Sequence, residues 1–219
     1  MGTFKKGILG SFSGKVGTVI GSTWRNLDVM KSLPKKSSKP PVQAQIDQRF
    51  KFSLITKLMA MAKSLLNIGY QSGNKIQSPV NTAVQYHLKN AISGISPNFT
   101  VNYSRVVLST GSLPSLENAK VTLLPQHSIK LTWDALTDLD AAELAERNKD
   151  GLMLILYSPA MGLYTTREGQ YKRAALTKDI VLPGILAGNP LHIWLFVASE
   201  DEKKTSYSQY LGAFNLIDE

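Results

Sequence analysis

The chain has 219 residues, of which 43% are hydrophobic and 19% are charged, so it is long and apolar enough to bury a core in one or two domains. It contains no cysteine, which excludes disulfide scaffolds, thiolate metal sites and cysteine nucleophiles. The formal net charge is +9. The first 63 residues hold twelve Lys or Arg against two acidic residues, and the rest hold thirteen against fourteen, so the positive excess lies in the N-terminal segment.

Residues 1–41 combine recurring glycines with β-branched and aromatic residues. Short extended pieces at residues 16–20 and 23–24 are separated by Gly21, which predicts a short, glycine-kinked hairpin. A run of Lys, Ser and Pro over residues 35–41 then predicts an extended linker. We therefore expect residues 1–41 to form a basic β-arm followed by a linker.

Residues 42–97 have the apolar spacing of helices. Apolar residues recur every three or four positions from Ile46 to Leu65, which predicts one helix that ends between residues 67 and 73. Ser78 followed by Pro79 predicts the N-terminus of a second helix, which we expect to end near Gly94. The segment is thus predicted to be a helical hairpin.

From residue 98 to residue 219 the apolar period changes to two. Seven short strands separated by turns are typical of a β-sandwich. Together with the predicted helical hairpin, this sandwich leads us to expect an α+β protein. The expected strands are residues 101–107, 119–124, 128–133, 152–158, 179–182, 191–198 and 206–211.

Part of this last segment resembles a fibronectin type III domain over residues 115–213. The residues that carry the resemblance are Ile129–Trp133, Leu154–Tyr157, Leu182-Pro183-Gly184, Leu191–Ala198 and Thr205–Ser208. The resemblance implies that Trp133 and Tyr157 pack in the core. The stretch from Asp138 to Asp150 is longer and more acidic than in that family.

The N-terminal segment carries a second resemblance. It reads Gly14-Lys15-Val16-Gly17, then Gly21-Ser22-Thr23-Trp24, and it is followed by Pro34 and by Gln45, Arg49 and Phe52. This pattern resembles an uncharacterised protein family of Bacteroidota, a domain of unknown function. The resemblance implies a common architecture and no activity.

The sequence contains no complete motif of an enzyme. Residues 10–16 look like a phosphate-binding loop, but Leu9 and Val16 stand where that motif needs Gly and Ser or Thr. The three histidines, His87, His127 and His192, lack metal-ligand spacing, and we expect the acidic cluster at residues 138–146 to be a solvated loop or helix face. We therefore expect no catalytic residue, no cofactor and no metal.

The hypothesis that fits most of the chain is a structural, self-assembling subunit of a filament or particle such as a virion component. In it, the arm of one copy docks on the next copy in an open, head-to-tail homo-oligomer. We expect Val16, Val19, Ile20 and Trp24 to be the apolar anchors of this interface, with Gly14, Gly17 and Gly21 allowing close backbone approach.

The alternative is a nucleic-acid-binding accessory protein that uses a basic patch on the arm. The patch comprises Lys5, Lys6, Lys15, Arg25, Lys31, Lys35, Lys36 and Lys39. The chain lacks a conventional signal peptide pattern and a transmembrane run, so we expect no membrane span. An extracellular filament or particle is one expected location, and the cytoplasm is the other.

Overall fold

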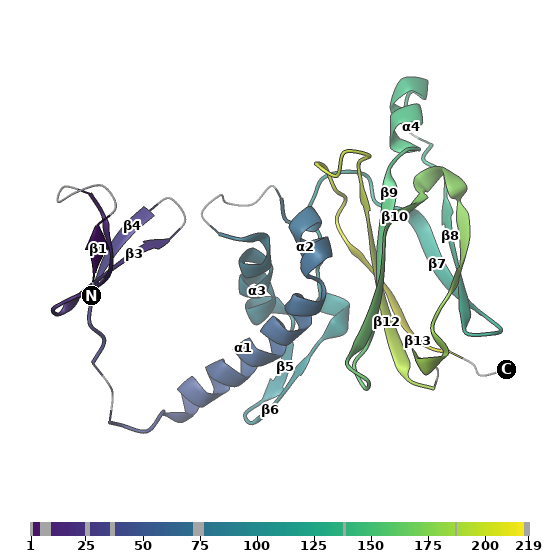
Figure 1. Ribbon diagram of the computed structural model, residues 1–219. Coiled ribbons are helices and arrows are strands. Elements are labelled where there is room, and N and C mark those ends of the chain that lie inside the picture. Colours follow the sequence, from purple (N-terminus) through teal and green to yellow (C-terminus); the bar gives the residue numbers. More distant parts are fainter. Residues whose placement is uncertain are drawn as a thin grey trace. The chain divides into compact units, whose positions relative to one another are not determined.

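The structure is a computed structural model that describes residues 2–4, 10–24, 27–35, 38–71, 77–137, 139–186 and 188–216 (Figure 1). The chain forms two compact units, residues 1–45 and residues 46–219. It is a mixed α+β protein, as predicted. The segments predicted as a helical hairpin and as a sandwich belong almost entirely to the second unit, where one hydrophobic core joins them.

The first unit is a four-stranded antiparallel sheet with the strand order β1-β2-β3-β4. Its strands are β1 (Thr3–Phe4), β2 (Phe12–Val16), β3 (Val19–Trp24) and β4 (Leu27–Ser32). The predicted hairpin is therefore part of a larger meander. Strands β2 and β3 are joined by the two-residue turn Gly17-Thr18, in which Gly17 has a φ of 58°. A left-handed residue at the first turn position suits glycine and matches the twist of the two strands.

The helices of the second unit are α1 (Gln43–Met61), α2 (Lys63–Gly69) and α3 (Pro79–Asn90). Helix α3 begins as predicted, because the Ser78 side chain accepts a hydrogen bond from the Asn81 N–H and Pro79 follows it. The first predicted helix is interrupted at Ala62, which separates α1 from α2. The helical face therefore bends, and both pieces contribute to one core.

The predicted strand over residues 101–107 is wrong. Strands β5 (Ile92–Ile95) and β6 (Asn98–Val101) form a hairpin, and the 3-10 helix η1 (Tyr103–Arg105) follows. The Asn102 side chain accepts a hydrogen bond from the Ser104 N–H, which starts this turn and ends the strand. After η1, the Val107 N–H donates its hydrogen bond to Nε2 of His87 and not to a backbone carbonyl of a neighbouring strand.

The rest of the second unit contains two antiparallel sheets. The three-stranded sheet has the order β11-β8-β7 and the four-stranded sheet the order β10-β9-β12-β13. Their strands are β7 (Glu117–Leu124), β8 (Ser128–Asp134), β9 (Gly151–Ser158), β10 (Leu163–Lys172), β11 (Thr177–Val181), β12 (Pro190–Ala198) and β13 (Gln209–Asn215). Strand β10 was not predicted, because it is mostly polar and lies at the edge of its sheet. Helix α4 (Ala141–Arg147) and the short 3-10 helices η2 (Arg173–Ala175) and η3 (Gly184–Leu186) lie in the connections.

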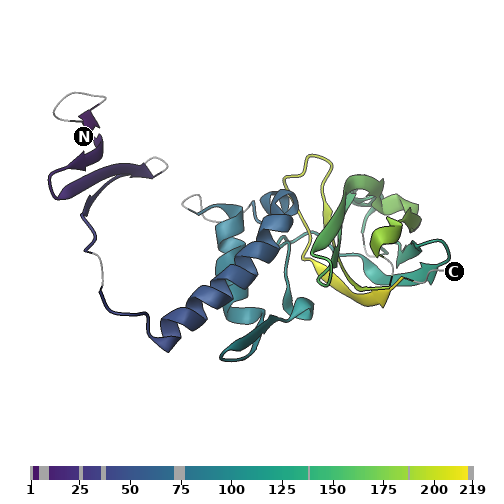
Figure 2. The same ribbon diagram turned by 60° about the horizontal axis from the view of Figure 1, so that its bottom comes forward.

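The four-stranded sheet is covered on both faces. Alternate residues of β9 face opposite cores: Leu152, Leu154 and Leu156 pack in one with the three-stranded sheet, and Met153 and Ile155 pack in the other with the helices. Figures 1 and 2 show α1, α2 and α3 on one side of this sheet and strands β7 and β8 on the other. The predicted core residues Trp133 and Tyr157 are both buried, on opposite sides of the sheet.

Gly69 provides a test of how tightly helix α2 packs. A Cβ atom at this position would lie 2.9 Å from the Cα of Ser109 and would also meet the Leu108 carbonyl oxygen. We expect Gly69→Ala to lower the free energy of unfolding by at least about 1–3 kcal/mol, because overpacking outweighs the better helix propensity of alanine.

The measurement is urea unfolding followed by circular dichroism. The control is Asn67→Ala at an exposed position of the same helix, where we expect little change or a small gain in stability. Equal or greater stability of Gly69→Ala would contradict the close approach of α2 to residues 108–109.

Candidate functional site

The register of the first unit divides the predicted interface residues between the two faces of its sheet. Val16 is paired with Val19, whereas Lys15 is paired with Ile20, so these two pairs point to opposite faces. Trp24, paired with Leu27, shares the face of Ile20. The first face, which we call the valine face, carries Phe12, Val16, Val19 and Met30, and the second, the tryptophan face, carries Ile20, Trp24, Leu27 and Val29.

The predicted interface glycines have roles within the sheet itself. Gly14 and Gly17 have positive φ angles of 108° and 58°, which disfavour other residues. A Cβ atom on Gly21 would lie 2.7 Å from the ring of Phe12 and would meet the Phe12 carbonyl oxygen. Phe12 thus packs against the backbone of the neighbouring strand. The local geometry of the sheet is enough to explain why glycine stands at these three positions.

The described part of the first unit's sheet has no buried hydrophobic side chain. Met30, Leu27, Val16 and Trp24 are 69%, 55%, 48% and 47% exposed. Strand β4 lies at the edge of the sheet. The unit therefore presents apolar side chains on both faces together with an edge strand.

The predicted basic patch is described only in part. Lys5, Lys6, Arg25 and Lys36 lie outside the described residues, and Lys15, Lys31, Lys35 and Lys39 are exposed. The structure brings two of them together, because Ile20 is paired with Lys15 on one side and with Lys31 on the other. These two lysines therefore flank Ile20 on the tryptophan face.

Two of the three histidines, His87 and His192, have structural environments. His87 is fully buried in α3, where its Nδ1 lies 2.6 Å from the Ala83 carbonyl oxygen and its Nε2 accepts the Val107 N–H at 2.9 Å. Its ring is therefore neutral, with the proton on Nδ1. His192, on β12, lies 2.7 Å from the Tyr210 hydroxyl and is surrounded by aromatic rings. In the described parts of the chain, no group of three or more His, Asp or Glu side chains is placed to hold a metal ion.

The acidic insertion contains a buried charge cluster that the sequence did not predict. Asp140 caps α4, and the exposed Glu143 and Glu146 fit the predicted solvated helix face. At the end of α4, however, Arg147 Nη1 lies 3.3 Å from Asp150 Oδ2, and Arg173 Nε lies 3.9 Å from the same oxygen. All three of these side chains are buried. The cluster ties the insertion to η2, because a buried carboxylate requires charged partners.

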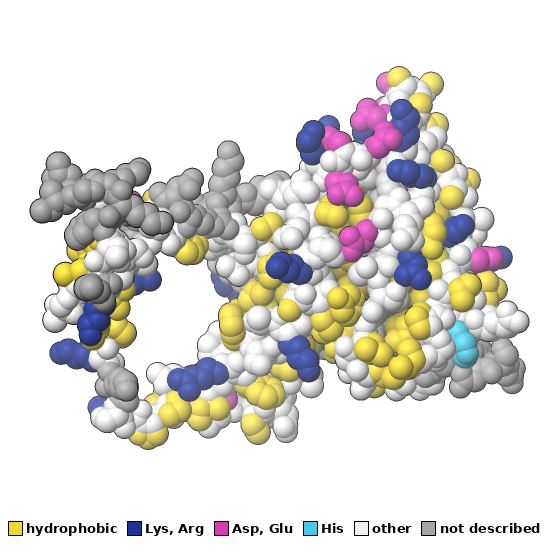
Figure 3. All heavy atoms as spheres, viewed as in Figure 1, with side chains coloured by type: hydrophobic (Ala, Val, Ile, Leu, Met, Phe, Trp, Pro, Cys, Tyr) yellow, Lys and Arg dark blue, Asp and Glu magenta, His cyan; other side chains and the backbone are white. Residues whose placement is uncertain are grey.

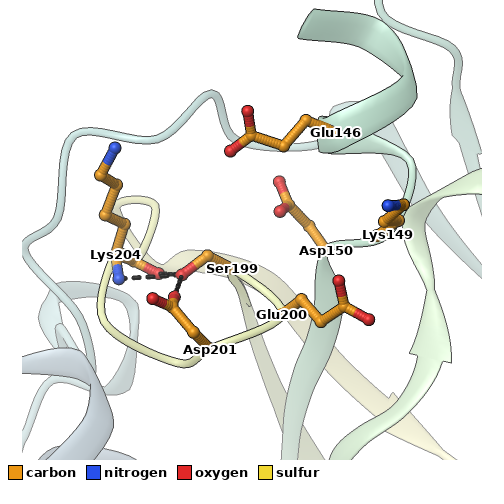
Figure 4. Close-up of a pocket in the computed structure, with 7 residues that line it drawn as sticks. All are labelled: Glu146, Lys149, Asp150, Ser199, Glu200, Asp201 and Lys204. Carbon is orange, nitrogen blue, oxygen red and sulfur yellow. Dashed lines mark hydrogen bonds between the residues drawn. The ribbon is translucent and has the colours of Figure 1, made fainter. Parts of the chain in front are cut away.

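Beside this cluster lies a small pocket that is rich in charged groups (Figure 4). Figure 3 shows carboxylates and basic side chains gathered at the same end of the second unit. The pocket is lined by Glu146, Lys149, Asp150, Ser199, Glu200, Asp201 and Lys204. A hydrogen bond from Ser199 Oγ at 2.7 Å, helped by Lys203, lowers the pKa of Asp201 to about 2. Two of the carboxylates, Asp150 and Asp201, already have partners within the chain. These groups therefore hold neighbouring connections together.

Among the described helices, none is both long enough and apolar enough to cross a membrane.

The chain belongs to a protein family described as "Family of unknown function (DUF6266)", whose pattern matches residues 11–212. No curated protein matches the chain. The matched range begins in the arm and extends to strand β13, so both units are part of the family pattern. The expectation of an uncharacterised family is confirmed, and its origin in Bacteroidota stays a prediction.

The buried His87 predicts a pH dependence of stability. Burial lowers the pKa of His87, so below the ordinary value of 6.5 the unfolded chain takes up a proton that the folded chain resists. The free energy of unfolding should therefore decrease as the pH falls below 6.5. Urea unfolding at pH 7.5 and pH 5.5 measures this loss.

The variant His87→Gln isolates the contribution of this histidine, since burial also lowers the pKa of His192 and shifts stability in the same direction. We expect a less stable protein at pH 7.5, because glutamine does not reproduce the shape of the buried ring or the geometry of its two hydrogen bonds, and a smaller stability difference between the two pH values. An identical pH difference in both proteins would contradict the assignment.

Proposed function

We propose that this protein is a structural subunit that assembles with copies of itself, and that the sheet of residues 2–35 is its connecting arm. The observation that carries the proposal is a four-stranded sheet with apolar side chains on both faces, none of which is buried among those described. Small sheets become stable when a hydrophobic face packs against something. We therefore infer that this sheet packs its apolar faces against a partner surface.

The second unit supports the proposal because it does not depend on the arm for its core. Both hydrophobic cores are built from residues of the second unit alone. The charges also favour attraction between arm and body. Residues 1–63 carry twelve basic and two acidic residues, whereas residues 100–219 carry eleven basic and fourteen acidic residues. An arm that docks on a neighbouring copy in head-to-tail order would bring opposite charges together.

Within this proposal the arm has two ways to bind. Strand β4 is an edge strand of six residues, which a neighbouring strand can extend. The valine face and the tryptophan face can each cover an apolar surface. Because both faces are apolar, we propose that the arm is held between parts of neighbouring subunits. We also propose a fibronectin type III-like sandwich for the body, which the strand orders β7-β8-β11 and β10-β9-β12-β13 support.

The test is the mass of the full-length protein by light scattering, with electron microscopy of the same samples. We expect large ordered assemblies for the wild type. Leu27→Ser with Trp24→Ser, on the tryptophan face, and Val19→Ser with Met30→Ser, on the valine face, should each reduce assembly at least tenfold in apparent affinity, because each pair removes about 2 kcal/mol or more of apolar burial. A chain that begins at Val42 should remain monomeric.

The matched control is Val181→Ser on strand β11 of the body. Val181 is 70% exposed, close to the 69% of Met30, so this substitution removes similar apolar surface away from the arm. We expect its assemblies to equal those of the wild type. A monomeric wild-type protein over a wide concentration range, or full assembly of both double variants, would overturn the proposal.

The second candidate function is nucleic-acid binding by the tryptophan face. The observation that favours it is the pairing of Lys15 and Lys31 across Ile20, on the face that also carries Trp24. Lysines neutralise phosphates, and an aromatic ring can stack on bases. We expect affinity for single-stranded DNA to fall steeply with salt and to drop in Lys15→Gln with Lys31→Gln. Lys178→Gln on the body is the control and should leave the affinity unchanged. An affinity that does not change with salt concentration would exclude this function.

A further inference from the structure

A shallow pocket of about 330 Å³ lies on the second unit, where three segments distant in sequence meet. Helix α3, the residues of η1 and those just after it, and the residues around the start of β13 form its walls. We call it the tyrosine pocket. Its polar lining comprises Tyr86, Asn90, Ser104, Arg105, Tyr207, Ser208 and Tyr210. This volume is at the lower end of the range typical for small-ligand sites.

Arg105 gives the pocket an uncompensated positive charge. The residue is exposed, and no carboxylate is among the described residues that line the pocket. Within the described chain, the Arg105 guanidinium forms no ion pair and no hydrogen bond. In contrast, Arg147 and Arg173 are both paired with Asp150. A free guanidinium presents a planar set of donors that fits a carboxylate or a phosphate.

The wall behind Arg105 is held in place from two sides. His87 accepts the Val107 N–H at 2.9 Å, and the Tyr70 hydroxyl donates to the Val107 carbonyl oxygen at 2.9 Å. The neighbouring Leu108 N–H donates to Ser208 Oγ at 2.9 Å, which links this wall to the segment before β13. A pocket whose walls are fixed in advance loses little entropy when a ligand binds.

The tyrosines supply flat apolar surfaces, while their hydroxyls are engaged within the protein: Tyr207 forms a hydrogen bond with Tyr86, and the Tyr210 hydroxyl lies 2.7 Å from His192 Nδ1. Burial and a hydrogen bond with Tyr86 raise the pKa of Tyr207, and burial raises the pKa of Tyr210, so both phenols stay protonated. Tyr86 and Tyr207 are 36% and 48% exposed, which leaves parts of their rings available. The Asn90 amide nitrogen donates to the Tyr86 carbonyl oxygen at 2.8 Å, which leaves its side-chain oxygen as an acceptor.

We propose that the tyrosine pocket binds a small anionic sugar, whose carboxylate or phosphate pairs with Arg105 and whose ring lies against the tyrosines. Hydroxyl groups of the sugar would donate to the side-chain oxygen of Asn90, and the sugar ring would pack against the exposed parts of the Tyr86 and Tyr207 rings. A simple inorganic anion would use the guanidinium alone and leave these groups idle. This site is independent of the arm and of the proposed assembly.

The test uses the full-length protein with four probes: glucuronate, glucose 6-phosphate, glucose and inorganic phosphate. Saturation-transfer NMR detects contact with the ligand, and isothermal titration gives the dissociation constant. We expect one or both anionic sugars to bind, with the two probes distinguishing a carboxylate from a phosphate. Glucose and inorganic phosphate should each bind at least tenfold more weakly, because each lacks one half of the recognition.

Arg105→Gln should raise the dissociation constant of the anionic sugar by about tenfold or more. Tyr207→Ala should also weaken binding, because the tyrosine ring is lost. The matched control is Arg49→Gln, which removes the same charge from an exposed position of α1 outside the pocket, and its binding should equal that of the wild type. The proposal is overturned if neither anionic sugar binds at millimolar concentration, or if Arg105→Gln binds like the wild type. Inorganic phosphate binding as tightly as the sugars would also overturn it, since it would indicate an anion site only.

Discussion

The second unit depends on two neighbouring strands, β9 and β12, that are buried on both faces. Residues of even and odd number along β9 enter different cores, one shared with the three-stranded sheet and one shared with the helices. Strand β12 does the same, with Ile193 and Leu195 on one side and Trp194 and Phe196 on the other. Each strand therefore stabilises two layers at once, so the helical segment and the sandwich form one folding unit.

The tyrosine pocket lies where the helical layer meets the four-stranded sheet. The walls of the tyrosine pocket come from α3 on the helical side and from the chain just before β13 on the sheet side. His87 and Tyr70 fix the backbone between them. The buried cluster of Arg147, Asp150 and Arg173 joins α4 to the residue just before β9 and to η2. Polar groups thus set the positions of connections, while apolar packing sets the layers.

The sequence predicted the elements with strong local signals and missed those decided by tertiary contacts. Ser78-Pro79 predicted the start of α3 because a cap and a proline act locally. Strand β10 is polar, and it forms because β9 offers it a pairing edge. The nearly uninterrupted apolar runs of β9 and β12 indicate strands that are buried on both faces, since a strand with one solvated face would alternate. Which arm residues share a face can be assigned only once the strand register is known. The pairing of Asp150 with Arg173 joins residues that are distant in sequence, so no local pattern predicts it.

The same two strands impose an order on synthesis. Helices α1 to α3 leave the ribosome well before β9 and β12, which are their partners in the core. Their apolar faces therefore stay uncovered until these later strands have been made. Contacts this distant in sequence slow folding and leave apolar surface open to other molecules meanwhile. The nascent chain is consequently a client for chaperones until β9 and β12 have been made, because the apolar faces of the helices stay uncovered until then.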